Sequence, residues 1–398
     1  MIILLDIDGV LIRNHAYSAA LKQTVAYFAR RMGLGEITLT QSDIEVFESQ
    51  SITIEWDSSA ISLAALFMER LRVIAEPANG GKPTPPLPPD FREALDQMAA
   101  EPVSIAHLDF SAVARRVGEA TPPGDLPSHA ALALFLEDLQ GLPLNSGKAQ
   151  AASLLHHMLA DCYNIDHAPA MQIFQNYAIG HAEYAQYYGL PPRFESEPLL
   201  EKLDRTYLNA EMRERLLAKR DAREVYPVIY TARPSLAPIE AGANLRGYTP
   251  EAEIARKISG IDPVPVTGFG KVDWMAKQVG LSGRDLVKPS PMESMAAMGI
   301  ARTGQEVESL KAALAVERGD HLRYPLTICA SETVHVFEDS PSSLRAVTRA
   351  VEKLNRQGLN LRLVRHGIAP EGSPKRAALA AIADLVHNDV NDGLEQIL

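Results

Sequence analysis

The chain begins with an almost unbroken apolar run, MIILLDIDGVLI, and then shows apolar residues at helical spacing through residues 15–35. This order predicts a buried strand that passes directly into a helix. A long stretch after it has few β-branched alternations and many Ala, Leu, Glu and Gln residues, which is typical of helices. Strand-like patterns return later, with helical patterns between most of them, at residues 225–235, 263–268, 333–340, 361–368 and 383–390.

Strands that alternate with helices predict an α/β fold, a Rossmann-like parallel sheet with helices on both faces. We expect residues 1–15 and 223–398 to form this core. Residues 16–222 then form a large, mostly α-helical cap inserted after the first strand. Pro-rich segments at 78–91 and 121–127 interrupt the insertion, because Pro lacks an amide proton and restricts the residue before it.

Length and composition agree with this division. A chain of 398 residues exceeds what one core usually supports, and 46% hydrophobic residues is ample for burial. The net charge of -11 argues against a nucleic-acid partner. Two cysteines, Cys162 and Cys329, suggest no disulfide framework and fit a reducing cytoplasm. No apolar run approaches the length of a membrane-spanning helix, and the opening run lacks the features of a signal peptide.

The first strand carries the main chemical signal, because Asp6 and Asp8 follow its apolar residues and Gly9 comes directly behind them. Alternate side chains of an extended strand share a face, so both carboxylates are expected on the same side. One carboxylate could attack phosphorus while the other protonates the leaving group and later activates water. Gly9 permits a sharp turn and close approach to a ligand. A buried strand ending in a simple Asp-Gly turn is the alternative.

Three further segments carry polar groups at strand ends or helix starts. Thr231 ends the strand VYPVIYT, where its hydroxyl and the following amides could bind a phosphoryl oxygen. Lys288 precedes a Pro-marked helix start and would supply one ammonium. Glu338 and Asp339 end the strand TVHVFED, and their oxygens suit Mg²⁺. Each segment taken singly could be turn or helix-cap chemistry, but the ordered set favours one site.

This ordered set resembles the haloacid dehalogenase-like (HAD) superfamily, and most closely its phosphatase and phosphomutase branch. In that resemblance DIDGVL is the first motif, with Asp6 as nucleophile and Asp8 as acid and base, and Thr231 ends the second motif. Lys288 in KPSP matches the third motif, and VFEDSPSSLRAV matches the fourth. The resemblance implies Mg²⁺ at Asp6, Asp8, Glu338 and Asp339. It also implies phosphate binding by Gly9, Thr231, Ala232 and Lys288.

The chain also departs from the pattern of that superfamily. The insertion at 16–222 is far larger than the compact helical bundle expected after the first motif. Additional residues separate Lys288 from Glu338, and ESLKAALAVERGD among them predicts an added helix. Because the insertion leaves and re-enters the core close to Asp6, we expect it to govern substrate choice while the core governs chemistry.

The leading functional hypothesis is a Mg²⁺-dependent phosphatase that acts on a small phosphorylated metabolite. A phosphomutase would use the same aspartyl-phosphate and return the phosphoryl group to its substrate. A catalytically idle scaffold with an insertion that binds another protein is the alternative from a different class. A dehalogenase is disfavoured, because those members replace the second aspartate and Asp8 is present here.

Three weaker signals have simpler interpretations. LVRHG at 363–367 resembles the opening motif of histidine phosphatases, but too little chain follows His366 to build that fold, so a structural strand residue is favoured. His157 and Asp161 share a helix face without a second ligand pair, which favours an ordinary polar face over a metal site. Arg233 could contact the substrate phosphate or lie in solvent, and both possibilities stay open.

Overall fold

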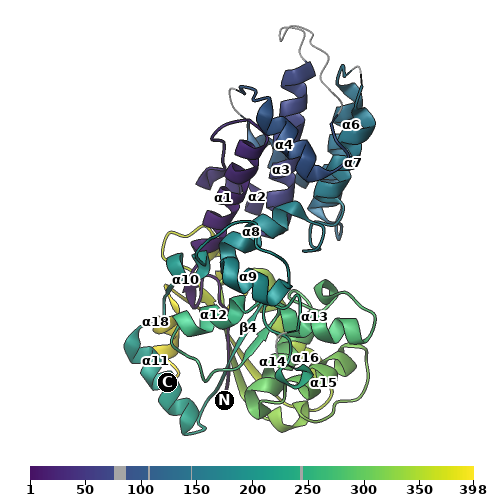
Figure 1. The fold of residues 1–398 in the computed structure, drawn as a ribbon. Helices are drawn as coiled ribbons and strands as arrows, with labels where there is room; N and C mark the ends of the chain where they lie inside the picture. The colour runs from purple at the N-terminus through teal and green to yellow at the C-terminus, as the bar shows by residue number, and fades with distance from the viewer. Residues whose placement is uncertain (76–86, 106–107, 145, 243–244) are drawn as a thin grey trace. The chain divides into compact units, whose positions relative to one another are not determined.

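The computed structural model describes residues 1–398 apart from 76–86, 106–107, 145 and 243–244. Most of the predicted Pro-rich break at 78–91 therefore lies outside the described residues. The chain divides into two compact units. The core unit comprises Met1–Asn14, Gln186–Gly189 and Leu200–Leu398, and the helical unit comprises His15–Ala185 and Leu190–Leu199 (Figure 1).

A six-stranded sheet in the order β5-β4-β1-β6-β7-β8 forms the centre of the core unit, and every pair in it is parallel. The predicted α/β class and all of the predicted strands are thereby confirmed. β1 has two neighbours, since Leu5 lies opposite Ile229 of β4 and opposite Phe337 of β6. The strands are β1 (Ile2–Leu5), β4 (Tyr226–Thr231), β5 (Val266–Gly268), β6 (Thr333–Glu338), β7 (Arg362–Ile368) and β8 (Leu385–His387).

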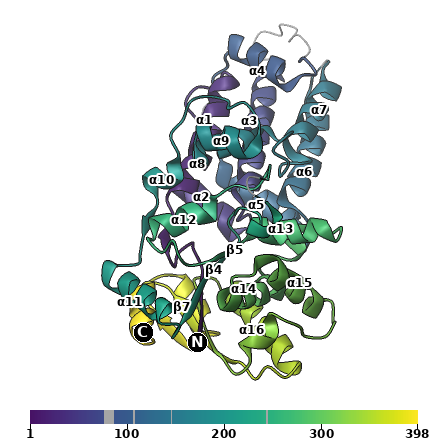
Figure 2. The same cartoon turned by 60° about the horizontal axis from the view of Figure 1, so that its bottom comes forward.

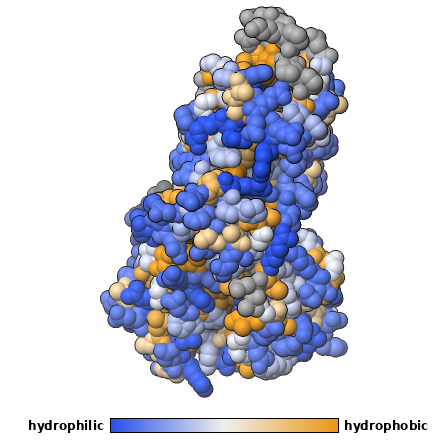
Figure 3. Space-filling model, in the orientation of Figure 1, coloured by the Kyte–Doolittle hydropathy of each residue, from blue (hydrophilic) through white to orange (hydrophobic). Residues whose placement is uncertain are grey.

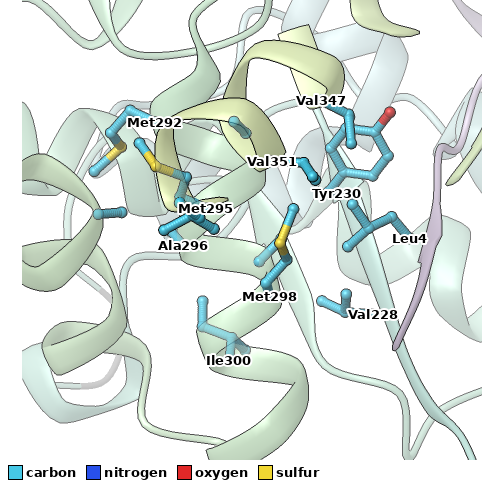
Figure 4. Close-up of a cluster of buried hydrophobic side chains, with 14 of the residues drawn as sticks. Leu4, Val228, Tyr230, Met292, Met295, Ala296, Met298, Ile300, Val347 and Val351 are labelled. Carbon is cyan, nitrogen blue, oxygen red and sulfur yellow. The ribbon is translucent and has the colours of Figure 1, made fainter. Parts of the chain in front are cut away.

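Helices cover both faces of this sheet (Figures 1 and 2). On one face Leu4, Val228 and Val336 belong to a hydrophobic cluster with residues of α13, α14, α15 and α16, part of which is shown in Figure 4. On the other face Ile3 and Phe337 cluster with residues of α11, α12 and α18. These helices are α11 (Ala210–Asp221), α12 (Glu251–Ile258), α13 (Phe269–Gln278), α14 (Pro291–Thr303), α15 (Glu306–Glu317), α16 (Pro341–Arg356), α17 (Lys375–Ala380) and α18 (Val390–Glu395).

The helix predicted between Lys288 and Glu338 is present as α15. It packs extensively against α14, and its Leu310 and Leu314 are buried in the same hydrophobic cluster as Leu4. The additional residues in this part of the chain therefore enlarge one helical layer of the core unit.

The helical unit has its own apolar interior. In α8 almost every residue is buried, and α8 packs against α1 and α3. Arg70 is also buried and donates to the carbonyls of Met32 and Glu101, which end α1 and α4. The helices are α1 (Ala16–Arg31), α2 (Gln41–Ser49), α3 (Glu55–Ala75), α4 (Phe91–Ala100), α5 (Phe110–Ala120), α6 (Pro127–Gly141), α7 (Lys148–Leu159), α8 (Pro169–Ile179) and the greater part of α9 (His181–Tyr188), whose end from Gln186 onward belongs to the core unit.

The second boundary of the insertion lies earlier than the sequence indicated. The sequence pattern placed it at residue 222, whereas the structure assigns everything from Leu200 onward to the core unit. After α10 (Leu199–Leu203), the short strand β3 (Arg205–Thr206) pairs antiparallel with β2 (Ile12–Arg13), directly after the first turn. α11 then buries Met212 and Leu216 in the core cluster, so these residues belong to the core by packing.

The surface drawn in Figure 3 is largely hydrophilic, with apolar residues in small scattered patches. None of the helices that the structure describes is long and apolar enough to span a membrane.

Candidate active site

The site begins where three neighbouring strands end. The register places Leu5 beside Ile229 and Phe337, so the next residues along the strands are Asp6, Tyr230 and Glu338. The Asp6 amide donates to the carbonyl of Phe337 at 3.1 Å, which continues this pairing by one residue. Because side chains alternate along a strand, all three follow the row that contains Leu4, Val228 and Val336. An apolar row therefore ends in two carboxylates and a phenol.

Lys288 reaches this row from the segment before α14. Ser290 caps α14 by accepting from the Met292 amide at 3.3 Å, and Pro291 occupies its first turn. The Lys288 ammonium donates to Asp6 Oδ1 at 2.9 Å and to Glu338 Oε1 at 2.8 Å. It also lies 4.4 Å from the centre of the Tyr230 ring. The structure thus brings the predicted third motif together with the first and the fourth.

The electrostatics of this contact favour a permanent cation. The Lys288 side chain is only 7% exposed. Burial alone would lower the pKa of Lys288, but the carboxylates of Asp6 and Glu338 outweigh burial and raise the pKa above its ordinary value. Burial and the nearby Asp6 charge raise the pKa of Glu338, and the Tyr230 hydroxyl donates to Glu338 Oε1. Lys288 therefore holds two carboxylates that would otherwise repel each other.

Asp6, Glu338 and Asp339 form the group best suited to a metal ion among the described residues, because one carboxylate oxygen of each lies within 4.8 Å of the others. Glu338 Oε2 is buried and has no hydrogen-bond partner in the described part of the chain. Asp339 Oδ2 accepts from the exposed Lys375 ammonium at 2.7 Å. A set of carboxylate oxygens with one unpartnered member fits a hard divalent cation such as Mg²⁺.

Gly9 has a steric part in this group. Its φ is +72°, and a Cβ atom at this position would lie 2.5 Å from Asp339 Oδ2. Its amide donates to the Ile12 carbonyl at 3.1 Å, so this N–H is engaged within the turn. The missing side chain allows the fourth motif to approach the first. A phosphate contact through Gly9 remains a prediction.

Asp8 lies in the turn that follows β1, where the Ile7 carbonyl accepts from the amides of Val10, Leu11 and Ile12. Its carboxylate is bound by Arg233, with Nε 2.9 Å from Oδ2 and Nη2 2.6 Å from Oδ1. The Asp8 side chain is therefore outside the group formed by Asp6, Glu338 and Asp339. Metal binding through Asp8 stays a prediction, and its backbone carbonyl is the oxygen that the contact with Arg233 leaves for it.

Thr231 is the last residue of β4, and Ala232 follows it at the same edge of the sheet. Thr231 is buried, and its hydroxyl oxygen accepts from the Arg233 amide at 3.2 Å. Ala232 is exposed. Thr231 thus shapes the loop that carries Arg233, and phosphate binding by Thr231 and Ala232 stays a prediction.

Sequence reasoning missed Glu293, Tyr230 and Asp204 as parts of the site. Glu293 is fully buried, accepts from the Lys288 amide at 2.9 Å, and has its pKa raised to about 7 by burial. Strand alternation in VYPVIYT already placed Tyr230 on the Val228 face, so that signal was available.

Of the two possibilities for Arg233, solvent exposure is wrong, because Arg233 is 3% exposed.

His366 is a structural strand residue, the interpretation that the sequence favoured. It is fully buried in β7, its Nε2 lies 2.9 Å from His335 Nδ1, and its Nδ1 lies 2.9 Å from His387 Nε2. Burial lowers the pKa of His366 to about 3, so the ring is uncharged at neutral pH. The prediction that His157 and Asp161 share a helix face is wrong, because α7 ends at Leu159 and Asp161 lies beyond it. His157 packs against Phe91 and belongs to no metal group within the described ranges.

The fold and the site together define an α/β protein with a carboxylate cluster at the carboxyl ends of its central strands. No protein-family model and no curated protein matches the chain. The X-ray structure of Northeast Structural Genomics Consortium target ZR25 is similar, with a TM-score of 0.65 and 14% identity over 100% of this chain and 98% of that chain. Phosphatase Tt82 from Thermococcus thioreducens aligns with a TM-score of 0.45 and 15% identity over 100% and 98% of the two chains. The first likeness shows a shared fold, and the function has to be argued from the site.

Proposed function

We propose that the protein is a Mg²⁺-dependent phosphomonoester hydrolase of the HAD-like superfamily that acts on a small phosphorylated metabolite. The observation that carries this proposal is the convergence of Asp6, Glu338, Asp339 and Lys288 at neighbouring strand ends. A buried, lysine-bound aspartate beside two further carboxylates suits a nucleophile that works next to a bound cation.

The cation would be held by Asp6, Glu338 and Asp339, with the Asp8 backbone carbonyl as the further ligand that the HAD resemblance implies. When bound, it would supply positive charge beside the transferring phosphoryl group. The chain contributes the Lys288 ammonium to the same charge balance. Two like charges at 4 Å repel by about 4 kcal/mol at an effective dielectric of 20, so the cluster needs this compensation.

In the first step Asp6 attacks phosphorus. Lys288 holds Oδ1 of Asp6 and so orients the carboxylate, and Oδ2 forms the new bond to phosphorus as the bond to the ester oxygen breaks. Asp8 gives its proton to the departing oxygen. In the second step water attacks the aspartyl-phosphate, Asp8 accepts the proton of that water, and Asp6 is regenerated with release of phosphate.

A phosphomutase would share the first step and differ only in the acceptor of the phosphoryl group. An acceptor hydroxyl on the substrate would take the place of water. Product analysis separates the two functions, because a mutase yields an isomeric sugar phosphate and a phosphatase yields inorganic phosphate.

A screen of phosphorylated metabolites, with Mg²⁺ and with EDTA, tests the proposal. We expect Mg²⁺-dependent phosphate release, and we expect Asp6→Asn to retain the fold while losing at least about 99% of turnover, because the amide lacks an attacking oxyanion. Circular dichroism and thermal unfolding would check the fold of the variant. Full activity after exhaustive chelation, or more than about a tenth of wild-type turnover in Asp6→Asn, would overturn the mechanism.

A further inference from the structure

Three charged side chains form a chain of ion pairs next to the carboxylate cluster. Arg233 Nε and Nη2 contact both oxygens of Asp8, and Nη2 also lies 3.2 Å from Asp204 Oδ2. The side chains of Asp204 and Arg233 are 0% and 2% exposed, whereas that of Asp8 is 37% exposed. One buried guanidinium thus joins a buried carboxylate to a partly exposed one.

This arrangement constrains Asp8 strongly. A planar guanidinium that donates through two nitrogens fixes the plane of the bound carboxylate as well as its distance. A buried ion left without a partner is costly, so Arg233 and Asp204 hold each other in place. Asp8 can therefore move away from Arg233 without leaving the guanidinium uncompensated, because the contact with Asp204 remains.

The three residues come from separate parts of the core unit. Asp8 lies in the turn after β1. Arg233 follows β4, and its carbonyl accepts from the Phe269 amide at 3.0 Å, which fixes its backbone. Asp204 lies between α10 and β3, where the chain returns from the helical unit, and β3 is held by its pairing with β2. The ion chain therefore links this return segment to the first motif.

We propose that Arg233 and Asp204 are positioning residues that set the Asp8 carboxylate for proton transfer. This inference rests on the proposed function, in which Asp8 gives a proton to the leaving oxygen and later takes one from water. Because both Asp8 oxygens are engaged by Arg233, one of these contacts must open while Asp8 carries the proton. Arg233 and Asp204 act through Asp8 and do not touch the reacting atoms.

The chemistry of the leaving group makes this role measurable. An alkoxide is a strong base and needs a proton as it departs, whereas 4-nitrophenolate departs readily without one. A residue that acts by positioning the general acid should therefore matter for alkyl phosphates and much less for 4-nitrophenyl phosphate. General acid catalysis typically contributes a hundredfold or more to such steps.

The experiment compares kcat/KM on an alkyl phosphate and on 4-nitrophenyl phosphate with saturating Mg²⁺, because kcat/KM reports the steps up to the aspartyl-phosphate and not its hydrolysis, which both esters share. We expect Arg233→Met to lower kcat/KM about 100-fold on the alkyl ester and less than about fivefold on the aryl ester, and Asp204→Asn to lower the alkyl value about tenfold. In an Asp8→Asn background, Arg233→Met should change either value less than about twofold. Arg302→Met is the control, because Arg302 is likewise ion-paired, with Glu332, and its side chain is 19% exposed. We expect wild-type kcat/KM on both esters from it.

A second variant serves as the control for effects on folding. Arg233→Met removes the guanidinium that contacts the buried Asp204 carboxylate, so Arg233→Met/Asp204→Asn removes both charges together and should show the same preference for the aryl ester. Equal losses on the two esters, or a further large loss in the Asp8→Asn background, would overturn the positioning role.

The failure of the proposed function can be distinguished from the failure of this inference. If the wild type hydrolyses neither ester nor any metabolite in the screen, the phosphatase proposal is overturned. The link between Arg233 and Asp8 is then measured by urea unfolding of Arg233→Met, Asp8→Asn and the double variant Arg233→Met/Asp8→Asn. Non-additivity of at least about fivefold in the unfolding equilibrium constant supports the link, and additive effects overturn it.

Discussion

At the scale of single residues, the site is a balance between clustered carboxylates and two lysines that differ in burial. The Lys288 side chain is 7% exposed and contacts Asp6 and Glu338, whereas the Lys375 side chain is 60% exposed and contacts Asp339. Lys288 is thus a fixed part of the site, while Lys375 can leave its partner at little cost because exposed pairs contribute about 1 kcal/mol or less. Asp339 is therefore the carboxylate of the group that is most easily released to a cation.

Glu293 gives a prediction about the pH dependence of stability. Burial raises the pKa of Glu293 from its ordinary 4.5 to about 7, so the folded protein keeps a proton that the unfolded chain releases. The free energy of unfolding then falls as pH rises from about 4.5 to 7, by up to roughly 3 kcal/mol. The amide introduced by Glu293→Gln cannot ionise, so this variant should lose less stability than the wild type as pH rises. Urea unfolding at pH 5 and pH 8 measures the free energy of unfolding of both proteins.

The control for Glu293 is Glu308→Gln, which removes an exposed carboxylate paired with Lys311. This variant should lose as much stability as the wild type between the two pH values. If Glu293→Gln also lost as much as the wild type, Glu293 would not hold a proton in the folded protein.

The predictability of individual site residues depended on where they lie in the sequence. Asp6, Glu338 and Asp339 stand directly after apolar strand patterns, and Lys288 stands before a Pro-marked helix start, so each carries a local signal. No local sequence pattern predicts the ion pairs of Arg233 with Asp8 and Asp204, because these residues are far apart in the sequence and meet only after folding. Burial of Glu293 likewise follows from tertiary packing of α14 against β4.

At the scale of elements, the turn after β1 determines how closely the first and fourth motifs approach. The alternation argument covers β1 up to Asp6; the chain turns after Ile7, and the Asp8 carboxylate contacts Arg233. A pattern of alternating residues cannot show where a strand gives way to a turn. The pairing of β2 with β3 was missed for the same reason, since two-residue strands have no periodicity.

Gly9→Ala tests this turn. A methyl group would meet Asp339 Oδ2 and displace that carboxylate, so divalent cations should bind at least about fivefold more weakly. Gly372→Ala is a matched control, because Gly372 also has a positive φ, of +81°, but no atom lies within 4 Å of a Cβ placed there. Both variants should lose about 1 kcal/mol of stability from backbone strain. Titration with Mn²⁺ measures the cation affinity of each variant. Equal Mn²⁺ affinities of Gly9→Ala and Gly372→Ala would contradict the close approach of Gly9 to Asp339.

At the scale of the whole molecule, the sequence predicted an α/β core interrupted by a large helical insertion, and the structure contains both parts. The first boundary was placed well because a strand pattern changes to a helical pattern there. The second was placed late because α11 looks like any other helix in the sequence, and only the burial of Met212 and Leu216 assigns it to the core. Control of substrate choice by the insertion remains a prediction.

The central claim is that Asp6 becomes phosphorylated during turnover. The most direct measurement is reduction of the enzyme with borohydride during steady-state hydrolysis, followed by mass spectrometry of the peptides, because an aspartyl-phosphate is reduced to homoserine. The account predicts homoserine at position 6, dependent on substrate and Mg²⁺ and lost in Asp6→Asn. Modification at Asp8 instead of Asp6, or sustained turnover with no modified aspartate, would contradict it.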